Sequence, residues 1–251
     1  MPAPSFRSNG AYTSGTGATN LALPAGYAVD DLLLFIVETA NNTGAGMSGL
    51  TTQTQTDLTN NGWTRVANSN TSLLSPTVAA SQNTLQDIWY NRATNTSQTT
   101  VAIADTGDHT LHVTLAFSNV IKTGNPFDGA INVTMTTASA QTTTGNLTTT
   151  RANCLIVTVI STPIDSAAAT INASPLLLIN GSGDDVELAE LCDLGSTSGN
   201  GGTIGVVKHR KPSVGATANV RANTLTSNVT ISWTGAIKCV MEQSWGEVSV
   251  I

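Results

Sequence analysis

Charged side chains are scarce in this chain. Lys, Arg, Asp and Glu together make up 10% of its 251 residues, well below the usual share of about a quarter. The net charge is −6 and the sequence pI is about 4.8, which argues against a nucleic-acid partner, because its phosphates would require a basic face. We therefore expect no nucleic-acid partner.

Cysteines are also few. The chain has three, Cys154, Cys192 and Cys239, an odd number at wide spacing. Such spacing suits neither a disulfide framework nor a zinc site, which needs closely paired ligands. Cys154 and Cys239 stand in apolar runs, where a free cysteine behaves as a small hydrophobic residue. We expect three free thiols and assembly in the cytosol.

Long apolar runs are missing as well. No stretch approaches the length of a membrane span, and the first residues form no apolar signal-peptide core. We therefore expect no membrane insertion and no signal peptide. The strongest run is residues 32–37, six apolar residues between Asp31 and Glu38. Its lack of alternation predicts a central strand that is covered on both faces.

Thr, Asn, Ser, Ala and Gly take the place of the missing charges, and many short apolar runs lie between turn residues. This pattern predicts an all-β fold, an antiparallel, jelly-roll-like β-sandwich with long polar loops. We expect one domain over residues 1–251, with a subdivision near 125–150 as the alternative. The other expected strands are 6–12, 19–23, 62–66, 85–90, 99–104, 109–117, 154–160, 176–179, 203–208, 216–222, 229–233, 236–241 and 245–251.

Several expectations about these strands are specific. The run 109–117 alternates and predicts a strand with one buried face, while the Thr-rich segment 129–150 predicts an exposed hairpin. Residues 184–191 fit either a strand or one helical turn. The residues expected to be buried together in one sandwich core are Leu33, Phe35, Leu155, Val157 and Leu177.

Two polar segments, 40–60 and 68–83, predict long surface loops. Loops of that length are either functional or make protein contacts. A weak echo joins Asn125-Pro126-Phe127-Asp128 to Thr162-Pro163-Ile164-Asp165. It is compatible with two related halves, but Pro and Asp are common after strands, and we favour that explanation.

The candidate sites begin with His109 and His112, which three-residue spacing in a strand places on opposite faces, a poor metal pair. The charges of Lys208-His209-Arg210-Lys211 are typical of a blunted sheet edge, and otherwise of an ion pair with an acidic neighbouring subunit.

Carboxylates are concentrated in one other segment. They could offer oxygen ligands to calcium, but a solvated strand gives the same pattern. In a strand, Asp185 and Glu187 would share a face. The members of this acidic segment are Asp184, Asp185, Glu187 and Glu190.

No nucleophile elbow, phosphate loop or His-Glu-x-x-His motif occurs in the sequence, so we assign no catalytic, cofactor or metal residue. Paired carboxylates for glycoside cleavage would come together only in the fold. Aromatic residues are 4% of the chain and more often fill a core than stack on sugars. The aromatic candidates are Trp63, Trp89, Tyr90, Trp233 and Trp245.

Six segments follow one another along the chain: Pro24-Ala25-Gly26, Asp30-Asp31-Leu32-Leu33-Leu34, Asn61-Gly62-Trp63-Thr64, Ile88-Trp89-Tyr90-Asn91-Arg92-Ala93, Leu115-Ala116-Phe117-Ser118-Asn119-Val120 and Asn125-Pro126-Phe127-Asp128. Through these segments the chain resembles a β-sandwich module of tailed-bacteriophage virion and tail surface proteins, also seen in bacterial adhesin-like proteins. The match is clearest over residues 20–130 and looser after 150.

The resemblance implies a jelly-roll-like sandwich used for display or attachment, and carries over no site residue. We expect a non-catalytic virion surface protein, either a capsid decoration or a tail accessory protein. Its partners would be capsid or tail proteins and copies of itself, as a trimer whose contacts order the two polar loops. The alternatives are a receptor- or carbohydrate-binding adhesin module that contacts a host glycan, and a polysaccharide-degrading enzyme.

Overall fold

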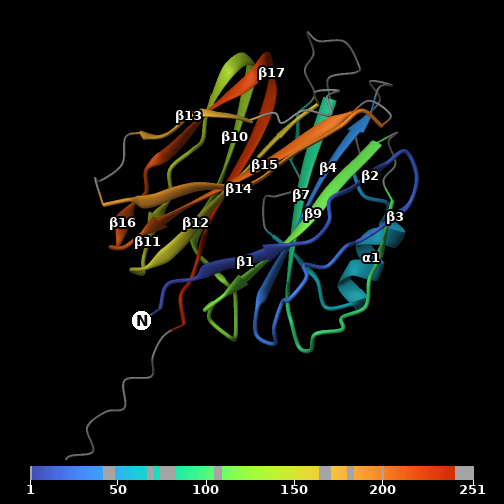
Figure 1. The fold of residues 1–251 in the computed structure, drawn as a ribbon, viewed down its shortest axis with the longest axis horizontal. Coiled ribbons are helices and arrows are strands. Elements are labelled where there is room, and N and C mark those ends of the chain that lie inside the picture. Colours follow the sequence, from blue (N-terminus) through green and yellow to red (C-terminus); the bar gives the residue numbers. More distant parts are fainter. Residues whose placement is uncertain are drawn as a thin grey trace, which may run out of the picture.

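The fold is all-β, as the sequence predicts, and the computed structural model describes residues 2–41, 49–66, 71–73, 83–104, 109–163, 171–179, 184–198 and 201–240. Within these ranges the strands form two large antiparallel sheets, which pack face to face, and two small two-stranded sheets. Figure 1 shows most of the first sheet on the right and most of the second on the left.

The first sheet is built from the first half of the chain, in the order β1-β9-β4-β7-β5. β2 adds to β9, and β6 adds to β7. Its strands are β1 (Ser5–Asn9), β2 (Thr13–Gly15), β4 (Leu32–Asn41), β5 (Thr64–Arg65), β6 (Thr71–Leu73), β7 (Asn83–Arg92) and β9 (His109–Ser118).

The second sheet is built from the second half, in the order β10-β17-β12-β15-β14, with β13 added to β17. The two small sheets are β3 (Thr19–Asn20) with β8 (Ala102–Ile103), and β11 (Thr148–Thr149) with β16 (Gly215–Ala216). The large strands are β10 (Phe127–Thr143), β12 (Cys154–Thr162), β13 (Ile171–Ile179), β14 (Val186–Ser196), β15 (Gly202–Lys211) and β17 (Asn219–Ile237).

The strand β4 is covered on both faces, which confirms the prediction from its unbroken apolar run. Leu34 and Ile36 point between the sheets, toward Val157 and other residues of the second sheet. Phe35 points the other way, into a second core on the outer face of the first sheet. Every residue of β4 from Leu32 to Thr39 is buried, and each large apolar side chain contributes about 1.5–3 kcal/mol by leaving water.

The two cores correct the expectation of one. Leu33 and Phe35 belong to the outer core, whereas Leu155 and Val157 belong to the core between the sheets. Leu177 is only half-buried. The reason is the period of two in a strand: neighbouring residues of β4 point to opposite faces, and both faces are covered.

A short helix, α1 (Thr52–Asn60), covers the outer face of the first sheet and corrects the prediction of a loop over 40–60. Thr51 caps its N-terminus by accepting a hydrogen bond from the Thr54 amide at 3.1 Å. Leu58 is buried in the outer core. The Thr54 hydroxyl lies 3.1 Å from both the amide and the carbonyl oxygen of Ala104, so the helix is anchored to the chain beyond β8.

Other predictions need correction too. All residues 109–117 are buried, because the outer layer covers β9 on its second face as well. The predicted hairpin 129–150 is mostly one strand, β10, which pairs with β17. The runs 219–222, 229–233 and 236–237 join into the single strand β17. Residues 42–48, most of 68–83 and all of 245–251 lie outside the described residues.

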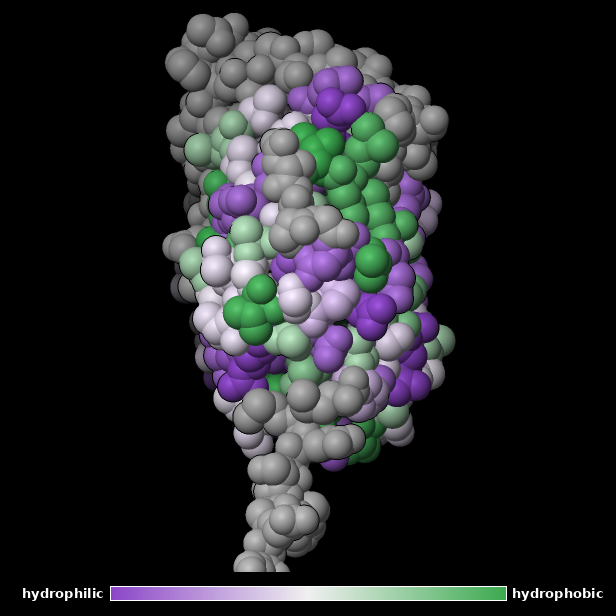
Figure 2. Space-filling model, turned by 90° about the vertical axis from the view of Figure 1, so that its left-hand side faces the viewer, coloured by the Kyte–Doolittle hydropathy of each residue, from purple (hydrophilic) through white to green (hydrophobic). Residues whose placement is uncertain are grey.

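Figure 2 views the molecule from the side where β11, β13 and β16 lie in Figure 1. Apolar and strongly polar residues lie next to each other on this face. Val186, just before the bulge in β14, is 37% exposed, and Val214 beside β16 is 60% exposed. The acidic segment 184–190 begins just before β14 and continues into it, and the basic run 208–211 lies at the end of β15.

Candidate functional site

The acidic and basic segments of the sequence face each other on adjacent strands. β14 pairs with β15, which places the carboxylates of 184–187 beside the basic run 208–211. Asp184 contacts the Lys211 ammonium and accepts from the Ser213 hydroxyl. Glu187 lies 3.0 Å from Arg210. The interpretation of the basic run as a blunted sheet edge is wrong, because β15 lies between β12 and β14. The alternative was an ion pair with a neighbouring subunit; the ion pairs that the structure shows form within the chain, with residues considered as calcium ligands.

The innermost of these ion pairs, between Lys211 and Asp185, is buried. Lys211 is fully buried, and its Nζ lies 3.6 Å from Oδ2 of Asp185. The same carboxylate accepts from the Ala218 amide at 3.1 Å, and its other oxygen lies 3.2 Å from Nε2 of His209. Burial raises the pKa of Asp185, while the Lys211 charge opposes the rise. Burial and then the charge of Lys211 lower the pKa of His209 to about 4, so its ring is neutral at pH 7.

The backbone conformation of the acidic segment decides whether its carboxylates lie together, as a calcium site would require. Residues 186–196 form a strand, but Glu187 has φ of 62° and the pairing shifts between Val186 and Ala189. This bulge breaks the alternation, so Asp185 is buried while the Glu187 side chain is 60% exposed. The two carboxylates do not share a face, contrary to prediction. In the described ranges no group of three or more His, Cys, Asp or Glu side chains is placed to hold a metal ion.

His109 and His112 point to opposite faces of β9, as predicted, and both are fully buried. His112 lies on the outer side, where Nε2 is 2.8 Å from the Thr19 hydroxyl and the ring packs edge-on against Phe35. Burial lowers its pKa to about 4. His109 points between the sheets, where Nε2 is 3.4 Å from Oε2 of Glu38.

Glu38 belongs to a polar cluster between the two sheets, which we call the inner polar cluster: Glu38, Thr84, Gln86, His109 and Ser161. The Thr84 hydroxyl donates to Glu38 at 2.7 Å, and the Gln86 amide donates to the Ser161 hydroxyl at 2.8 Å. Burial raises the pKa of Glu38, although His109 and Thr84 oppose the rise. Because Ser161 lies on β12, the cluster joins the two sheets by a hydrogen bond.

Close packing of the second sheet confines the same carboxylate. A Cβ atom on Gly202 would lie 2.0 Å from Oε2 of Glu38, so any larger residue at the start of β15 would displace the Glu38 carboxylate. The inner polar cluster is thus closed by backbone on the side of the second sheet.

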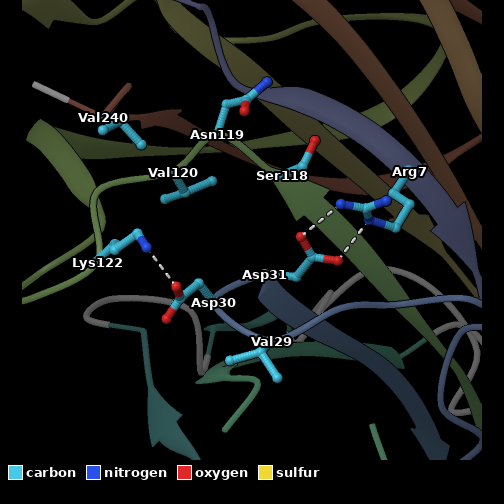
Figure 3. Close-up of a pocket in the computed structure, with 9 residues that line it drawn as sticks. All are labelled: Arg7, Val29, Asp30, Asp31, Ser118, Asn119, Val120, Lys122 and Val240. Atoms are coloured by element: carbon cyan, nitrogen blue, oxygen red, sulfur yellow. Dashed lines mark hydrogen bonds and ion pairs between the residues drawn. The ribbon is translucent and has the colours of Figure 1, made fainter. Parts of the chain in front are cut away.

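A pocket of about 210 Å³ lies where the first and second halves of the chain meet (Figure 3). Arg7 on β1 donates to Asp31 at 2.6 Å, and Lys122 lies 2.6 Å from Asp30. Figure 3 shows both ion pairs at the wall of the pocket. The Lys122 and Asp30 side chains are 64% and 49% exposed, so this pair lies at the mouth. The remaining lining residues are Val29, Ser118, Asn119, Val120 and Val240.

The aromatic candidates are core residues rather than a sugar-binding platform. Trp63 and Trp89 are buried in the outer core, and Trp233 is buried between the sheets. Tyr90 is half-buried and packs edge-on against Phe127. Arg65 covers the Trp89 ring at 5.0 Å from its centroid. Trp245 lies outside the described residues.

The three cysteines are free and buried, in agreement with the prediction. The Cys154 thiol donates to the carbonyl oxygen of Arg151, and the Cys239 thiol to that of Ala152. Burial raises the pKa of Cys154 to about 12 and likewise that of Cys192, so neither is a thiolate at neutral pH.

Sequence reasoning missed the pocket and, apart from His109, the inner polar cluster. Glu38 was noted only as the end of the apolar run, although alternation from Leu34 and Ile36 places it on their face. Arg7 and Lys122 carry no local signal, because their partners Asp31 and Asp30 are distant in sequence. Only the tertiary fold brings these charges together.

Comparison of the chain with protein-family models, with curated proteins and with solved structures gave no match. In the described ranges, no helix has the length and apolarity that a membrane crossing needs. The function must therefore be argued from the residues themselves.

Proposed function

We propose that the protein is a non-catalytic structural component of a bacteriophage particle, displayed on its surface as a capsid decoration or tail accessory protein. The observation that carries the proposal is that ionisable side chains in the interior are paired with one another. Glu38 with His109, Asp185 with Lys211 and Asp87 with Arg65 are cross-strand pairs with at least one fully buried side chain. Buried pairs of this kind are weak evidence for stability, and we assign them the role of fixing strand register and sheet orientation.

The resemblance to virion proteins points the same way, because the residues that carry it occupy framework positions. The segment Asp30 to Leu34 starts the central strand, and Trp63 fills the outer core. Leu115 and Phe117 lie in the core between the sheets, and Phe127 begins the second sheet. A display protein needs this framework and a surface that tolerates contacts, which the neutral Thr, Ser and Asn residues supply.

The test is to locate the chain on particles. Particles produced from the genome that encodes the chain would be purified, analysed by mass spectrometry and imaged by electron microscopy after antibody labelling. We expect stoichiometric amounts of the protein and label in a regular array on the capsid or at the tail. Absence of the protein from intact particles would contradict the proposal.

A second measurement separates display from the enzyme and adhesin alternatives. Purified protein would be incubated with capsular and cell-wall polysaccharides of the host and assayed for new reducing ends, and its binding to immobilised glycans would be measured in parallel. We expect neither cleavage nor saturable binding. Cleavage would establish the enzyme, and binding without cleavage the adhesin module.

A further inference from the structure

The two halves of the chain have the same strand topology. In each half, the first main strand pairs with the last, the last with the second, the second with the fourth, and the fourth with the third. This order is β1-β9-β4-β7-β5 in the first sheet and β10-β17-β12-β15-β14 in the second. The strands β2, β6 and β13 are additions to this scheme.

The two small sheets obey the same scheme. β3 lies between the first and second main strands of its half, and it pairs with β8, which lies between the fourth and fifth. β11 and β16 occupy the same two places in the second half and pair in the same way. Agreement of a minor feature at equivalent connections is not expected from two unrelated sheets.

Residue register agrees as well. In the first sheet Leu32 pairs with Phe117 and with Arg92, and Phe117 pairs in turn with Phe6. The second sheet has the same rung across four strands. The equivalent residues are Phe6, Phe117, Leu32 and Arg92 in the first sheet, and Phe127, Ile237, Leu155 and Arg210 in the second.

The start of the central strand shares an uncommon backbone conformation in both halves. Asp30, two residues before Leu32, has φ of 71°, and Asn153, two residues before Leu155, has φ of 57°. Side chains other than glycine rarely adopt this left-handed conformation, although Asp and Asn do so most readily. The left-handed conformation of Asp30 is therefore a feature that both halves share, and it does not by itself mark the pocket as a functional site.

Each half has a carboxylate near this turn, but it comes from a different segment in each half: Asp31 before β4 and Asp128 on β10. Asp31 accepts from Arg7 at 2.6 Å and from the Ala28 amide at 2.8 Å. In the second half the position of Arg7 is taken by Asp128, which follows Phe127, and that of Asp31 by Cys154, which precedes Leu155.

The contacts at these exchanged positions correspond. Asp128 accepts from the Arg151 amide at 2.9 Å, and the Cys154 thiol lies 3.8 Å from Oδ2 of Asp128. Arg151 stands four residues before Leu155, as Ala28 stands four before Leu32. The backbone donor is thus equivalent, while the acceptor has moved from the start of the second main strand to the first main strand, across the last strand that lies between them.

The segments that follow the two last strands contact each other reciprocally. Val120 bridges to Cys239 in antiparallel fashion. The Ile121 amide donates to Lys238 at 3.2 Å, and the Val240 amide donates to Asn119 at 3.0 Å. Such hydrogen bonds belong to any antiparallel bridge; the sign of a two-fold axis is that β4 and β9 pack against β15, while their equivalents β12 and β17 pack against β7, the equivalent of β15.

We infer that residues 5–118 and 127–237 are two copies of one structural unit, and that the face between the sheets is a self-association surface of that unit, fused into one chain. The partner that fits the inner face of one unit is a second copy of the same unit, packed as in an isologous dimer. The sequence echo of Asn125-Pro126 and Thr162-Pro163 is unrelated to this repeat, because it precedes β10 but follows β12.

The exchanged carboxylate provides a test in the full-length chain. Arg7→Asp places a carboxylate opposite Asp31, and Asp31→Cys leaves Arg7 and the Ala28 amide without their acceptor. We expect each single substitution to lower the melting temperature by about 5 °C or more. The double variant Arg7→Asp/Asp31→Cys copies the arrangement of the second unit and should melt within about 2 °C of the wild type.

The reciprocal double variant Asp128→Arg/Cys154→Asp copies the arrangement of the first unit into the second, and its melting temperature should recover in the same way relative to its single variants. The matched control is Arg65→Asp/Asp87→Cys, another Arg–Asp pair within the first sheet. Asp87 stands five residues before Arg92, and the equivalent residue, five before Arg210, is Gly205. The second unit therefore has no arrangement at this place that the control could copy. This control should stay at least about 5 °C below the wild type.

The outcomes are distinct even if single variants fail to fold. Two equivalent units are supported if the melting temperature recovers in either unit-copying double variant, the one at positions 7 and 31 or the one at positions 128 and 154. The control at positions 65 and 87 must not recover. If both unit-copying double variants melt as low as their single variants or remain insoluble, or if the control recovers equally, the inference is wrong. The particle-location experiment is independent of this result.

Discussion

At the residue scale, the interior of this protein contains charge that is paired across strands. Glu38, Asp185 and Lys211 are buried, yet each lies within reach of a partner on a neighbouring strand. A buried charge that loses its partner costs far more than the pair contributes. The stability of the protein should therefore respond sharply to single substitutions at these places, and to pH.

The first prediction concerns His112. Its folded pKa of about 4 lies below the ordinary histidine value of 6.5, because burial disfavours the charged ring. Between pH 6.5 and about 4 the unfolded chain binds a proton that the native state does not, so stability falls as pH falls through this window. His112→Gln should remove a loss of about 2–3 kcal/mol between pH 7 and pH 4.5, measured by urea unfolding.

The comparison of variant with wild type isolates this group. Glu38, Asp185 and His209 titrate in both proteins, and their contributions cancel in the difference. An unchanged pH dependence in His112→Gln would show that the His112 ring binds its proton equally well in the native and the unfolded chain, contrary to the prediction.

The second prediction concerns Lys211. Lys211→Met leaves the buried carboxylate of Asp185 without its ammonium partner and should lower the free energy of unfolding by about 3–5 kcal/mol. Adding Asp185→Asn should restore a large part of the loss. The control is Arg210→Met on the same strand, whose partner Glu187 is 60% exposed, and which should change stability by less than about 1 kcal/mol. Equal effects of the two single substitutions would contradict the role of burial.

At the element scale, prediction from sequence succeeded where burial follows a simple period and failed where tertiary contacts override it. The central strand β4 and the buried strand β12 follow from apolar runs of strand length. The two-faced burial of β9 could not be read from its alternation, because Thr114 and His112 are polar yet lie beneath the outer layer. The outer layer itself gives little apolar signal.

The helix α1 is the clearest failure. Its sequence is rich in Thr, a poor helix former, and only Leu58 and Thr54 are buried. An isolated segment of nine residues would not be helical in water, since nucleation is too costly for so short a helix. The cap at Thr51 and the contacts with Ala104 and the outer core supply what propensity lacks. None of these could be inferred before the fold was known.

The third prediction tests this explanation of α1. Thr51→Ala removes the N-cap and should cost about 1 kcal/mol. Leu58→Ala opens a cavity in the outer core and should cost about 2–5 kcal/mol. Thr56→Ala, on the exposed face of the same helix, is the control and should be neutral or slightly stabilising. Chemical denaturation of the three variants gives the order; a loss at Thr56 as large as at Leu58 would contradict it.

The fourth prediction concerns the contact between the two units. Val120 and Cys239 form a non-hydrogen-bonded antiparallel pair, flanked by the two reciprocal hydrogen bonds. Such pairs bring Cα atoms to about 4.5 Å, within the range of a disulfide. Val120→Cys should therefore form a disulfide with Cys239 on mild oxidation, detected by mass spectrometry of peptides. Val240→Cys, one residue along, is the control and should not cross-link to Val120→Cys in a Cys239→Ser background.

At the scale of the whole molecule, two similar sheets carry different outer layers. The first is covered by α1, β3 and β8 over a large apolar core, and the second by β11 and β16 over a small one. The inner faces thus serve folding in both units, whereas the outer faces have diverged. Partner contacts of a display protein would use these outer layers, because the inner faces are already occupied by each other.

The last prediction is that the purified protein is a homo-trimer whose interface includes the segment 40–60. The exposed side of α1 bears Thr52, Gln53 and Thr56, which are neutral and lose less than charged groups when water is removed. We expect sedimentation or native mass spectrometry to give three times the 25.8 kDa of one chain.

Thr56→Arg places a charge in that interface and should give monomers whose fold, followed by circular dichroism, is intact. The control Val214→Arg lies beside β16, at a position 60% exposed, and should leave the trimer unchanged. A wild-type protein that is monomeric at every concentration up to the millimolar range would remove self-association from the proposal. A trimer that Thr56→Arg leaves intact would place the interface elsewhere than on α1.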